Sequence, residues 1–468
     1  MTRQGLLQKK IQYYLNSLSP SARDLLVRGV EDGIKKGKTD EQLEMILSAA
    51  RKLAREDDTD QPREEDLKRA FYLPIEPFIA KQPLFSRQQG RISRIALDAV
   101  WVWLKRDVSP GVVEKILEEG VTDPSLSEEE KALICAKKLR DIVLPQIATH
   151  LDQIHTVPVA EQRLAAQLGN NIILEELRDM MTGFIFGPVL SRKLKTVPAV
   201  METFEDMKSA GFPATVLELL KAHSRQTAFI FSAILNRTRN AGELVILVAS
   251  LAGTDDCTKI ANSPFATGID IAFSEFEWFA CHLQKLGLDK SNIEEFENIA
   301  NSYHLIDRKF ERHLIIPPTS VWGKKRTEQR NRISQAIAQD LDGFPMSLRK
   351  ALKLPGGREL ERLDEIALEE TSRGARILVL AEKIRDCLSL NEPIARARRE
   401  VDQSFEVMIN ALNDRLRRAT GEEHMLCQEL AKHVLGFAET LISYEYSASL
   451  RRQFEVAGNS QGGFAAGF

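Results

Sequence analysis

The sequence predicts an all-α protein, an irregular multi-helix body followed by a C-terminal antiparallel bundle of long helices. Apolar residues recur every three or four positions through most of the 468 residues. Almost no stretch alternates polar with apolar residues between turn signals, as a half-buried strand would. Aromatic residues make up only 7% of the chain, which favours packing through Leu, Ile and Ala over a β-sandwich.

Residues 1–54 are predicted to form an N-terminal helical hairpin. Its first helix ends at Gly37, and Thr39 with Gln42 three residues later forms a capping box that opens the second. The acidic, polar stretch 55–66 follows and is expected to be a linker.

A central helical domain is predicted over residues 67–314. Ser127 and Glu130 form a second capping box at the start of a long helix. The stretches 227–235 and 243–251 are rich enough in apolar residues to be buried helices.

The segment 71–79, at the start of this domain, contains Pro74 and Pro77. Two prolines so close argue against a regular helix, because each lacks an N–H donor and restricts the backbone. We expect this segment to be extended and to lie across the helical body.

A C-terminal helical bundle is predicted over residues 331–456. Three long helical stretches, about 358–388, 393–420 and 422–456, have similar lengths and short connections, which favours an antiparallel arrangement. The glycine-rich residues 457–468 are expected to be a flexible tail.

The charge balance gives no global sign of a nucleic-acid binder. The chain has 64 basic and 67 acidic side chains and a net charge of -3. Nucleic-acid binders usually carry a basic excess, because neutralising phosphates drives their affinity. A surface that binds anions would therefore have to be a local basic patch.

The cysteines and the apolar stretches predict a cytoplasmic protein with no transmembrane segment. The chain has five widely spaced cysteines, an odd number that does not resemble a secreted disulfide framework. The N-terminus is polar and basic and lacks the apolar core of a signal peptide. The longest apolar stretch, 244–252, is far shorter than the roughly 20 residues that span a bilayer.

Motifs for nucleotide binding, hydrolysis and metal binding each lack a required part. Gly37 begins a G-K-T sequence, but Asp32 stands where a phosphate-binding loop needs glycine. The G-x-S-x-G match at 458–462 lies at the end of the chain, with no partner residues downstream. His424 and Cys427 share a helix face but supply only two ligands. We therefore predict no catalytic residue, no cofactor and no metal.

The best basic run is a candidate anion-binding patch beside Trp322. Such a run can bind phosphates or an anionic membrane surface, although its commoner meaning is a solvated start of a helix. Its members are Lys324, Lys325, Arg326, Arg330 and Arg332.

Glu275, Glu277 and His282 form a candidate polar site near Trp278. Glu275 and His282 share a helix face, and a carboxylate beside an imidazole can do acid–base work. The commoner meaning of such a pair is a histidine at the edge of the core that a carboxylate satisfies.

The leading functional hypothesis is a non-enzymatic helical scaffold or adaptor that binds a partner protein or itself. Long amphipathic helices, balanced charge and the lack of a complete catalytic motif favour it. The alternatives are a binder of nucleic acid or membrane lipid through the basic run, and an enzyme with an unrecognised site in the central domain.

Overall fold

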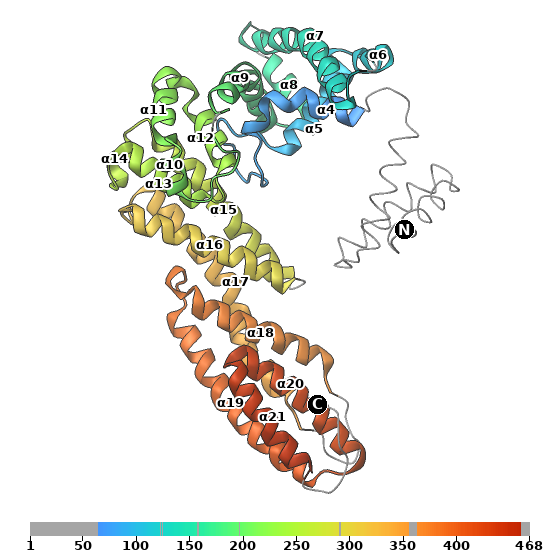
Figure 1. The fold of residues 1–468 in the computed structure, drawn as a ribbon, viewed down its shortest axis with the longest axis vertical. Coiled ribbons are helices and arrows are strands. Elements are labelled where there is room, and N and C mark those ends of the chain that lie inside the picture. The colour runs from blue at the N-terminus through green and yellow to red at the C-terminus, as the bar shows by residue number, and fades with distance from the viewer. Residues whose placement is uncertain are drawn as a thin grey trace, which may run out of the picture. The chain divides into compact units, whose positions relative to one another are not determined.

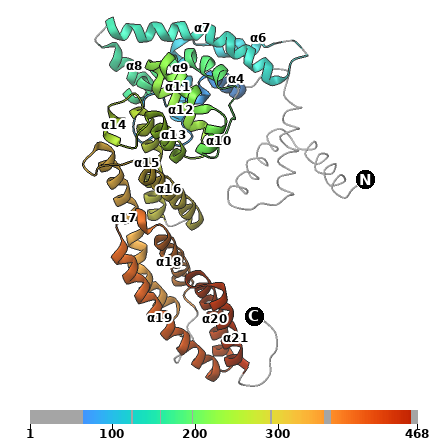
Figure 2. The ribbon, with the colours of Figure 1, turned by 60° about the vertical axis from the view of Figure 1, so that its left-hand side comes forward.

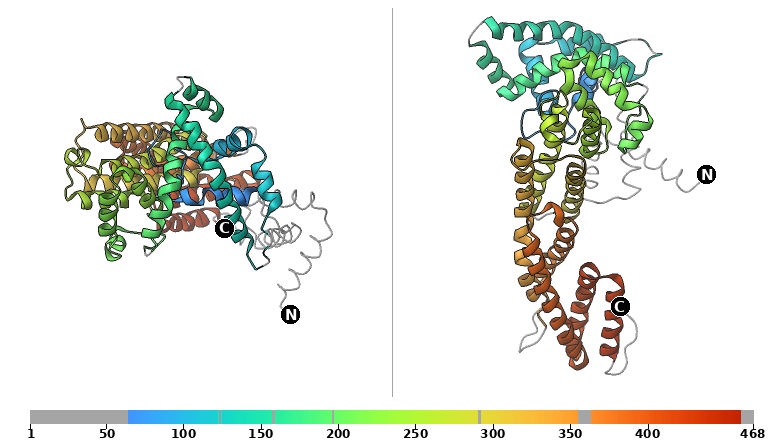
Figure 3. Two further views of the ribbon diagram at one scale, coloured as in Figure 1. Left: turned by 90° about the horizontal axis from the view of Figure 1, so that it is seen from above. Right: turned by 90° about the vertical axis from the view of Figure 1, so that its left-hand side faces the viewer.

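The structure is a computed structural model that describes residues 64–459, apart from 122, 124, 157–158, 196, 290–291 and 355–362. Within that part of the chain it has 18 α-helices and no β-strand, which confirms the all-α prediction (Figure 1). Figure 3 shows coiled ribbons and no arrow in two further directions of view. The predicted hairpin at 1–54 lies outside the described residues. The tail predicted over 457–468 is wrong for residues 457–459, which belong to the helix α21 (Tyr444–Asn459), and its remaining residues lie outside the described ones.

The chain divides into two compact units, each built from two separate stretches. The first unit takes the described residues up to Pro74 together with Leu97–Leu174. The second unit takes Ile75–Ala96 and the chain from Glu175 onward. None of the described helices is long and apolar enough to cross a membrane.

The first unit is organised around the long helix α7. Its helices are α4 (Glu64–Tyr72), most of α5 (Arg94–Trp103), the π-helical turn η2 (Leu104–Val108), α6 (Val112–Glu119), α7 (Glu128–Thr156) and α8 (Ala160–Leu168). The predicted capping box is present, because Glu130 N–H donates to Ser127 Oγ (3.3 Å) and Ser127 N–H donates to the Glu130 carboxylate (2.9 Å). Arg140 of α7 donates to the carbonyls of Ala70 and Phe71 and so satisfies the C-terminal end of α4.

The segment with two prolines differs from the extended conformation that its sequence predicts. α4 continues to Tyr72, and Leu73–Phe78 forms a 3-10 helix, η1, with Ile75 and Phe78 buried. The φ angle that proline imposes is compatible with a 3-10 turn, so the prolines exclude a long α-helix and not helical backbone as such.

The second unit contains two helices in which most residues are buried, α12 (Thr227–Arg237) and α13 (Ala241–Ala252). Its helices before α17 are α9 (Asn171–Lys193, which begins in the first unit), α10 (Phe204–Ser209), α11 (Phe212–Ala222), η3 (Ser224–Gln226), α12 (Thr227–Arg237), α13 (Ala241–Ala252), α14 (Cys257–Ala261), α15 (Ala266–Asp289) and α16 (Ile293–His313). Every residue of α12 from Ala228 to Leu235 is buried, and most of α13 is buried too, as the apolar stretches predict.

A loop over residues 80–91, here the 80–91 loop, is closed at its base by backbone hydrogen bonds and anchored to α15 by Arg91. Ala80 N–H donates to the Ile92 carbonyl, and Ile92 N–H donates to the Phe78 carbonyl. Arg91, only 1% exposed, donates to Glu275 (2.5 Å) and Ser274 (2.7 Å) of α15. A short segment early in the chain is thus anchored on residues that come much later.

Helix α17 (Val321–Ala351) leads from α15 and α16 into the C-terminal bundle (Figure 2). It runs without interruption through residue 331, where the predicted C-terminal domain begins. The remaining helices are α18 (Glu365–Lys383), η4 (Arg385–Cys387), α19 (Asn391–Arg418), α20 (Gly421–Leu441) and α21 (Tyr444–Asn459).

The C-terminal bundle differs from its prediction in one element. The stretch predicted as one helix over 422–456 is two helices, α20 and α21, which pack against each other. Ser443 separates them, since its Oγ accepts a hydrogen bond from Tyr446 N–H, as an N-cap does. In α19, Val401, Phe405 and Leu412, which recur at helical spacing, are buried, whereas Met408 of the same stripe is half-buried.

Candidate functional site

The five side chains of the basic run lie in the first turns of α17 and meet different surroundings. Lys324 and Lys325 are exposed. Arg332 pairs with Glu328 on the same helix (2.7 Å), and its Nη1 donates to Cys281 Sγ (2.9 Å). The run therefore does not form one free basic surface.

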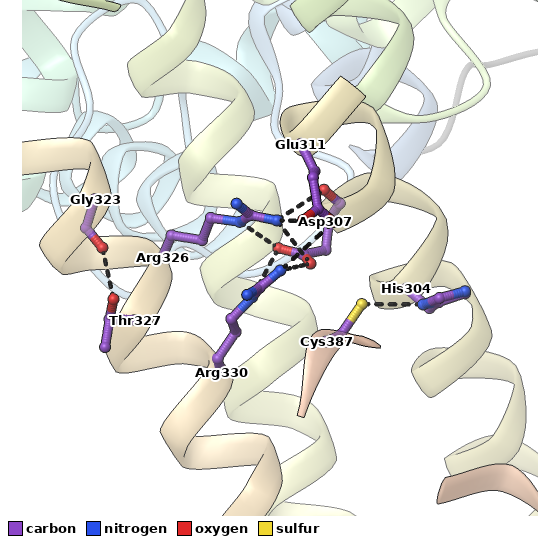
Figure 4. A network of polar contacts seen from close by, with 8 residues as sticks. All are labelled: His304, Asp307, Glu311, Gly323, Arg326, Thr327, Arg330 and Cys387. Atoms are coloured by element: carbon purple, nitrogen blue, oxygen red, sulfur yellow. Dashed lines mark hydrogen bonds and ion pairs between the residues drawn. The ribbon is translucent and has the colours of Figure 1, made fainter. Parts of the chain in front are cut away.

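Arg326 and Arg330 both turn toward Asp307 of α16 (Figure 4). Arg326 Nε lies 2.7 Å from Asp307 Oδ1, and Arg330 Nη2 lies 2.6 Å from Asp307 Oδ2. Glu311, one turn further along α16, is a more distant partner of both arginines, at 3.6 and 3.9 Å. We call these four residues the Asp307 cluster.

The Asp307 carboxylate has no exposed surface, whereas the two guanidinium side chains keep 15% and 24% exposure. Burial by itself would raise the pKa of Asp307, but the hydrogen bonds and positive charges of Arg326 and Arg330 outweigh it and hold the pKa below its ordinary value. Two of the five predicted anion-binding residues thus neutralise an internal charge. Anion binding by this run stays a prediction, and it would rest mainly on Lys324 and Lys325.

A cysteine–histidine pair lies beside this cluster. His304 Nδ1 is 3.0 Å from Cys387 Sγ (Figure 4). Cys387 has no exposed surface, and burial together with the negative charge of Asp307 raises the pKa of its thiol. A nucleophilic cysteine needs a lowered pKa and access to substrate, so this pair lacks the features of a catalytic dyad.

The candidate polar site residues on α15 have separate partners. Glu275 binds Arg91 of the 80–91 loop, whereas His282 Nε2 lies 3.1 Å from Glu295 of α16 and its ring stacks on Trp278. Glu277 lies on the other side of α15, because two residues correspond to about 200° around a helix. The structure therefore does not join these three residues in one acid–base site.

His424 and Cys427, which share a helix face, have no further metal ligands around them among the described residues. His424 Nε2 lies 3.1 Å from the Gln428 amide, and Cys427 is buried. In the described part of the chain no three His, Cys, Asp or Glu residues are placed to hold a metal ion.

The C-terminal bundle has a groove of about 950 Å³ between α18 and α20, here the α18–α20 groove. Two of its apolar residues are buried and two are half-buried: Leu368, Phe437, Leu363 and Leu426. Its exposed charged residues are three glutamates and one lysine: Glu365, Glu369, Glu429 and Lys432. An apolar floor with a mainly acidic rim results.

Gly436 lies in this groove, in the interior of α20. A glycine inside a helix costs about 0.5–1 kcal/mol relative to alanine. A Cβ atom at Gly436 would meet no atom within 4 Å, so no contact among the described residues requires glycine there. The groove thus keeps an opening next to bare helix backbone.

No family model, curated protein or solved structure matches this chain. The candidate site is therefore defined by its geometry alone. Leu426 and Phe437 recur at helical spacing in the sequence, which is typical of a core-facing stripe, but this spacing gives no sign that the stripe is left partly open. The only signal in the sequence was Gly436, a glycine between Leu435 and Phe437 in an otherwise regular helical pattern.

Proposed function

We propose that this protein is a non-enzymatic helical adaptor whose C-terminal bundle binds an amphipathic helix of a partner protein. The observation that carries the proposal is the α18–α20 groove, with buried Leu368 and Phe437 below an acidic rim. Helix-in-groove recognition uses such a combination, with apolar anchors entering a groove between two helices.

The charge of the rim favours a basic partner helix. Glu365, Glu369 and Glu429 outnumber Lys432, so lysine or arginine residues beside the apolar face of the incoming helix would be complementary. Gly436 lets that helix approach the backbone of α20 closely. Such a partner is a protein, which agrees with the adaptor hypothesis that the sequence favours.

We place this interaction in the cytoplasm. All five cysteines are free, and Cys135, Cys257, Cys387 and Cys427 are buried among the helices. Unpaired buried thiols are typical of proteins from a reducing compartment.

The test uses the full chain and two synthetic helical peptides with the same leucine stripe, one flanked by lysine and one by glutamate. We expect fluorescence anisotropy to show tighter binding of the lysine peptide, by about tenfold, since a few exposed charge pairs contribute on the order of 0.2–1 kcal/mol each. The difference should shrink as salt is added.

The matched variants are Gly436→Leu and Gly343→Leu. Gly343 also lies inside a helix, α17, and also has no atom within 4 Å of its Cβ position. Only Gly436→Leu should block the peptide, because only that side chain enters the groove. Equal binding of both peptides, or binding that survives Gly436→Leu, would contradict the proposal. A dimer that Gly436→Leu dissociates would place a second copy of the chain in the groove.

A further inference from the structure

A second feature of the second unit is a cavity of about 450 Å³ between the 80–91 loop, α15 and α17. Thr267, Asp270, Ser274 and Glu277 follow one another at helical spacing and present one polar face of α15 to it. Trp322 Nε1 donates to Asp270 Oδ1 (2.8 Å) and so ties α17 to α15 at this wall. A cavity of this volume is within the range of about 300–1,000 Å³ that holds small ligands.

Three side chains that line the cavity have buried polar atoms that lack hydrogen-bond partners. Gln329 of α17 is 3% exposed, and its Oε1 has no partner. Gln88 Oε1 has none either. Arg87 uses Nη2 to pair with Asp179 (2.7 Å), but its Nε and Nη1 are buried without a partner. Buried polar atoms in folded proteins are nearly always paired, so several beside one cavity need a partner that the described residues do not supply.

The wall also contains Glu328, which pairs with Arg332, and two further charged residues. Glu277 and Lys325 line the cavity, and neither makes a hydrogen bond or ion pair with another described residue. The wall therefore has positively charged donors on Arg87 and Lys325. It also has acceptors on Gln88, Gln329 and Glu277.

We propose that this cavity binds a free α-amino acid. A simple anion would leave the acceptors of the wall unpaired, and a simple amine would leave the guanidinium unpaired, whereas a zwitterion satisfies both sets. The carboxylate of the ligand pairs with Arg87 and Lys325. Its ammonium group donates to Gln329 and Glu277.

Binding requires a small rearrangement of the wall. The partnerless atoms of Arg87 and Gln329 are shielded from solvent, so these side chains rotate toward the ligand. Rotations of long side chains are fast and common when ligands bind. Because Asp179 holds Arg87 through Nη2 alone, the rest of the guanidinium is available for such a movement.

The test is isothermal titration of the full chain with the proteinogenic L-α-amino acids, one at a time. We expect saturable heat from one amino acid or a few with similar side chains. The corresponding amine without the carboxylate, and the corresponding acid without the amino group, should each bind at least about tenfold more weakly, because each leaves a charge in the wall unpaired. If no amino acid binds, or if either truncated ligand binds as well, the proposal is overturned.

Lys325→Gln and Glu277→Gln should each weaken the tightest ligand by about tenfold. Lys324→Gln is the matched control, because Lys324 is equally exposed on the same turn but does not line the cavity. Gln329→Met keeps the side-chain volume and removes the partnerless amide oxygen. It should raise the melting temperature of the free protein while weakening the ligand, a combination that a purely structural glutamine would not give. An unchanged affinity in Lys325→Gln and Glu277→Gln would overturn the proposal.

Discussion

Helix α18 packs tightly on one neighbour and leaves a groove beside another. Toward α17, a Cβ atom at Gly374 would lie 2.5 Å from the Phe344 ring, so the small residue is needed for the helices to touch. Toward α20, the groove holds Gly436, which has nothing opposite it. Both glycines carry the same helix cost, but only Gly374 has a contact within the described chain that explains it.

The Asp307 cluster, like the contact at Gly374, has its partners within the protein, and here the partners are charges. Its carboxylate is fully buried and meets two guanidinium groups, whereas the glutamates on the rim of the groove are exposed. The comparison teaches that a charge or a glycine points to an external partner only where the protein itself supplies none.

The largest expected effect on stability is that of Asp307→Asn, which removes a buried charge whose partners lie within the protein. The loss of the buried charge should lower the free energy of unfolding by about 3 kcal/mol, near the lower end for buried ion pairs, because the two arginines keep some exposure. Urea denaturation of the full chain measures it. Glu311→Gln is the control and should cost less than about 1 kcal/mol, since Glu311 is a distant, exposed partner. Equal effects of the two variants would contradict a buried role for Asp307.

The same contact predicts a dependence on pH. The folded-state pKa of Asp307 lies below its ordinary value of 3.8, so its stabilising contribution is complete above the unfolded pKa and is lost as the pH falls through the folded one. The difference in unfolding free energy between the wild type and Asp307→Asn should therefore be constant above about pH 5 and shrink in acid. A difference that grows as the pH falls would contradict a lowered pKa for Asp307 in the folded state.

Gly374→Ala tests whether the close contact between α17 and α18 requires glycine. The added methyl group meets the Phe344 ring, and overpacking of this kind costs about 1–3 kcal/mol. Thermal unfolding of the full chain should show a lower midpoint. A higher midpoint would mean that Phe344 moves aside at no cost.

Gly436→Ala should have the smallest effect and the opposite sign. With open space around the new methyl group, improved helix propensity should stabilise the protein by about 0.5–1 kcal/mol. Gly343→Ala should do the same in α17, where the surroundings are equally open. Destabilisation by Gly436→Ala alone would reveal a packing role for that glycine.

The helical fold was predictable because its signals are local. The capping box of Ser127 and Glu130 and the apolar run of α12 depend only on neighbours in sequence, and the structure has both. The break at Ser443 was missed, since the apolar period continues through it and only the side-chain cap marks the turn.

The candidate sites were not predictable in the same way, because they depend on which helices meet. A run of five basic residues gives no sign that Arg326 and Arg330 will turn toward Asp307, about twenty residues earlier on another helix. Glu277 and Lys325 were both singled out from the sequence, but as members of different groups. The structure brings them to the wall of one cavity with Gln329, a residue with no distinguishing local pattern.

The anchoring of the 80–91 loop bears on how the chain is made. Arg91 is synthesised 184 positions before its partner Glu275, and residues Leu97–Leu174 of the first unit are made in between. The early stretch of the second unit, Ile75–Ala96, can therefore form its contacts with α15 only after the later stretch has been synthesised. Residues Leu97–Leu174 of the first unit can form contacts with one another before that. A fragment beginning at Glu175 would lack Ser93 and Gly90 and would leave the buried carboxylates of Glu176 and Asp179 without those partners.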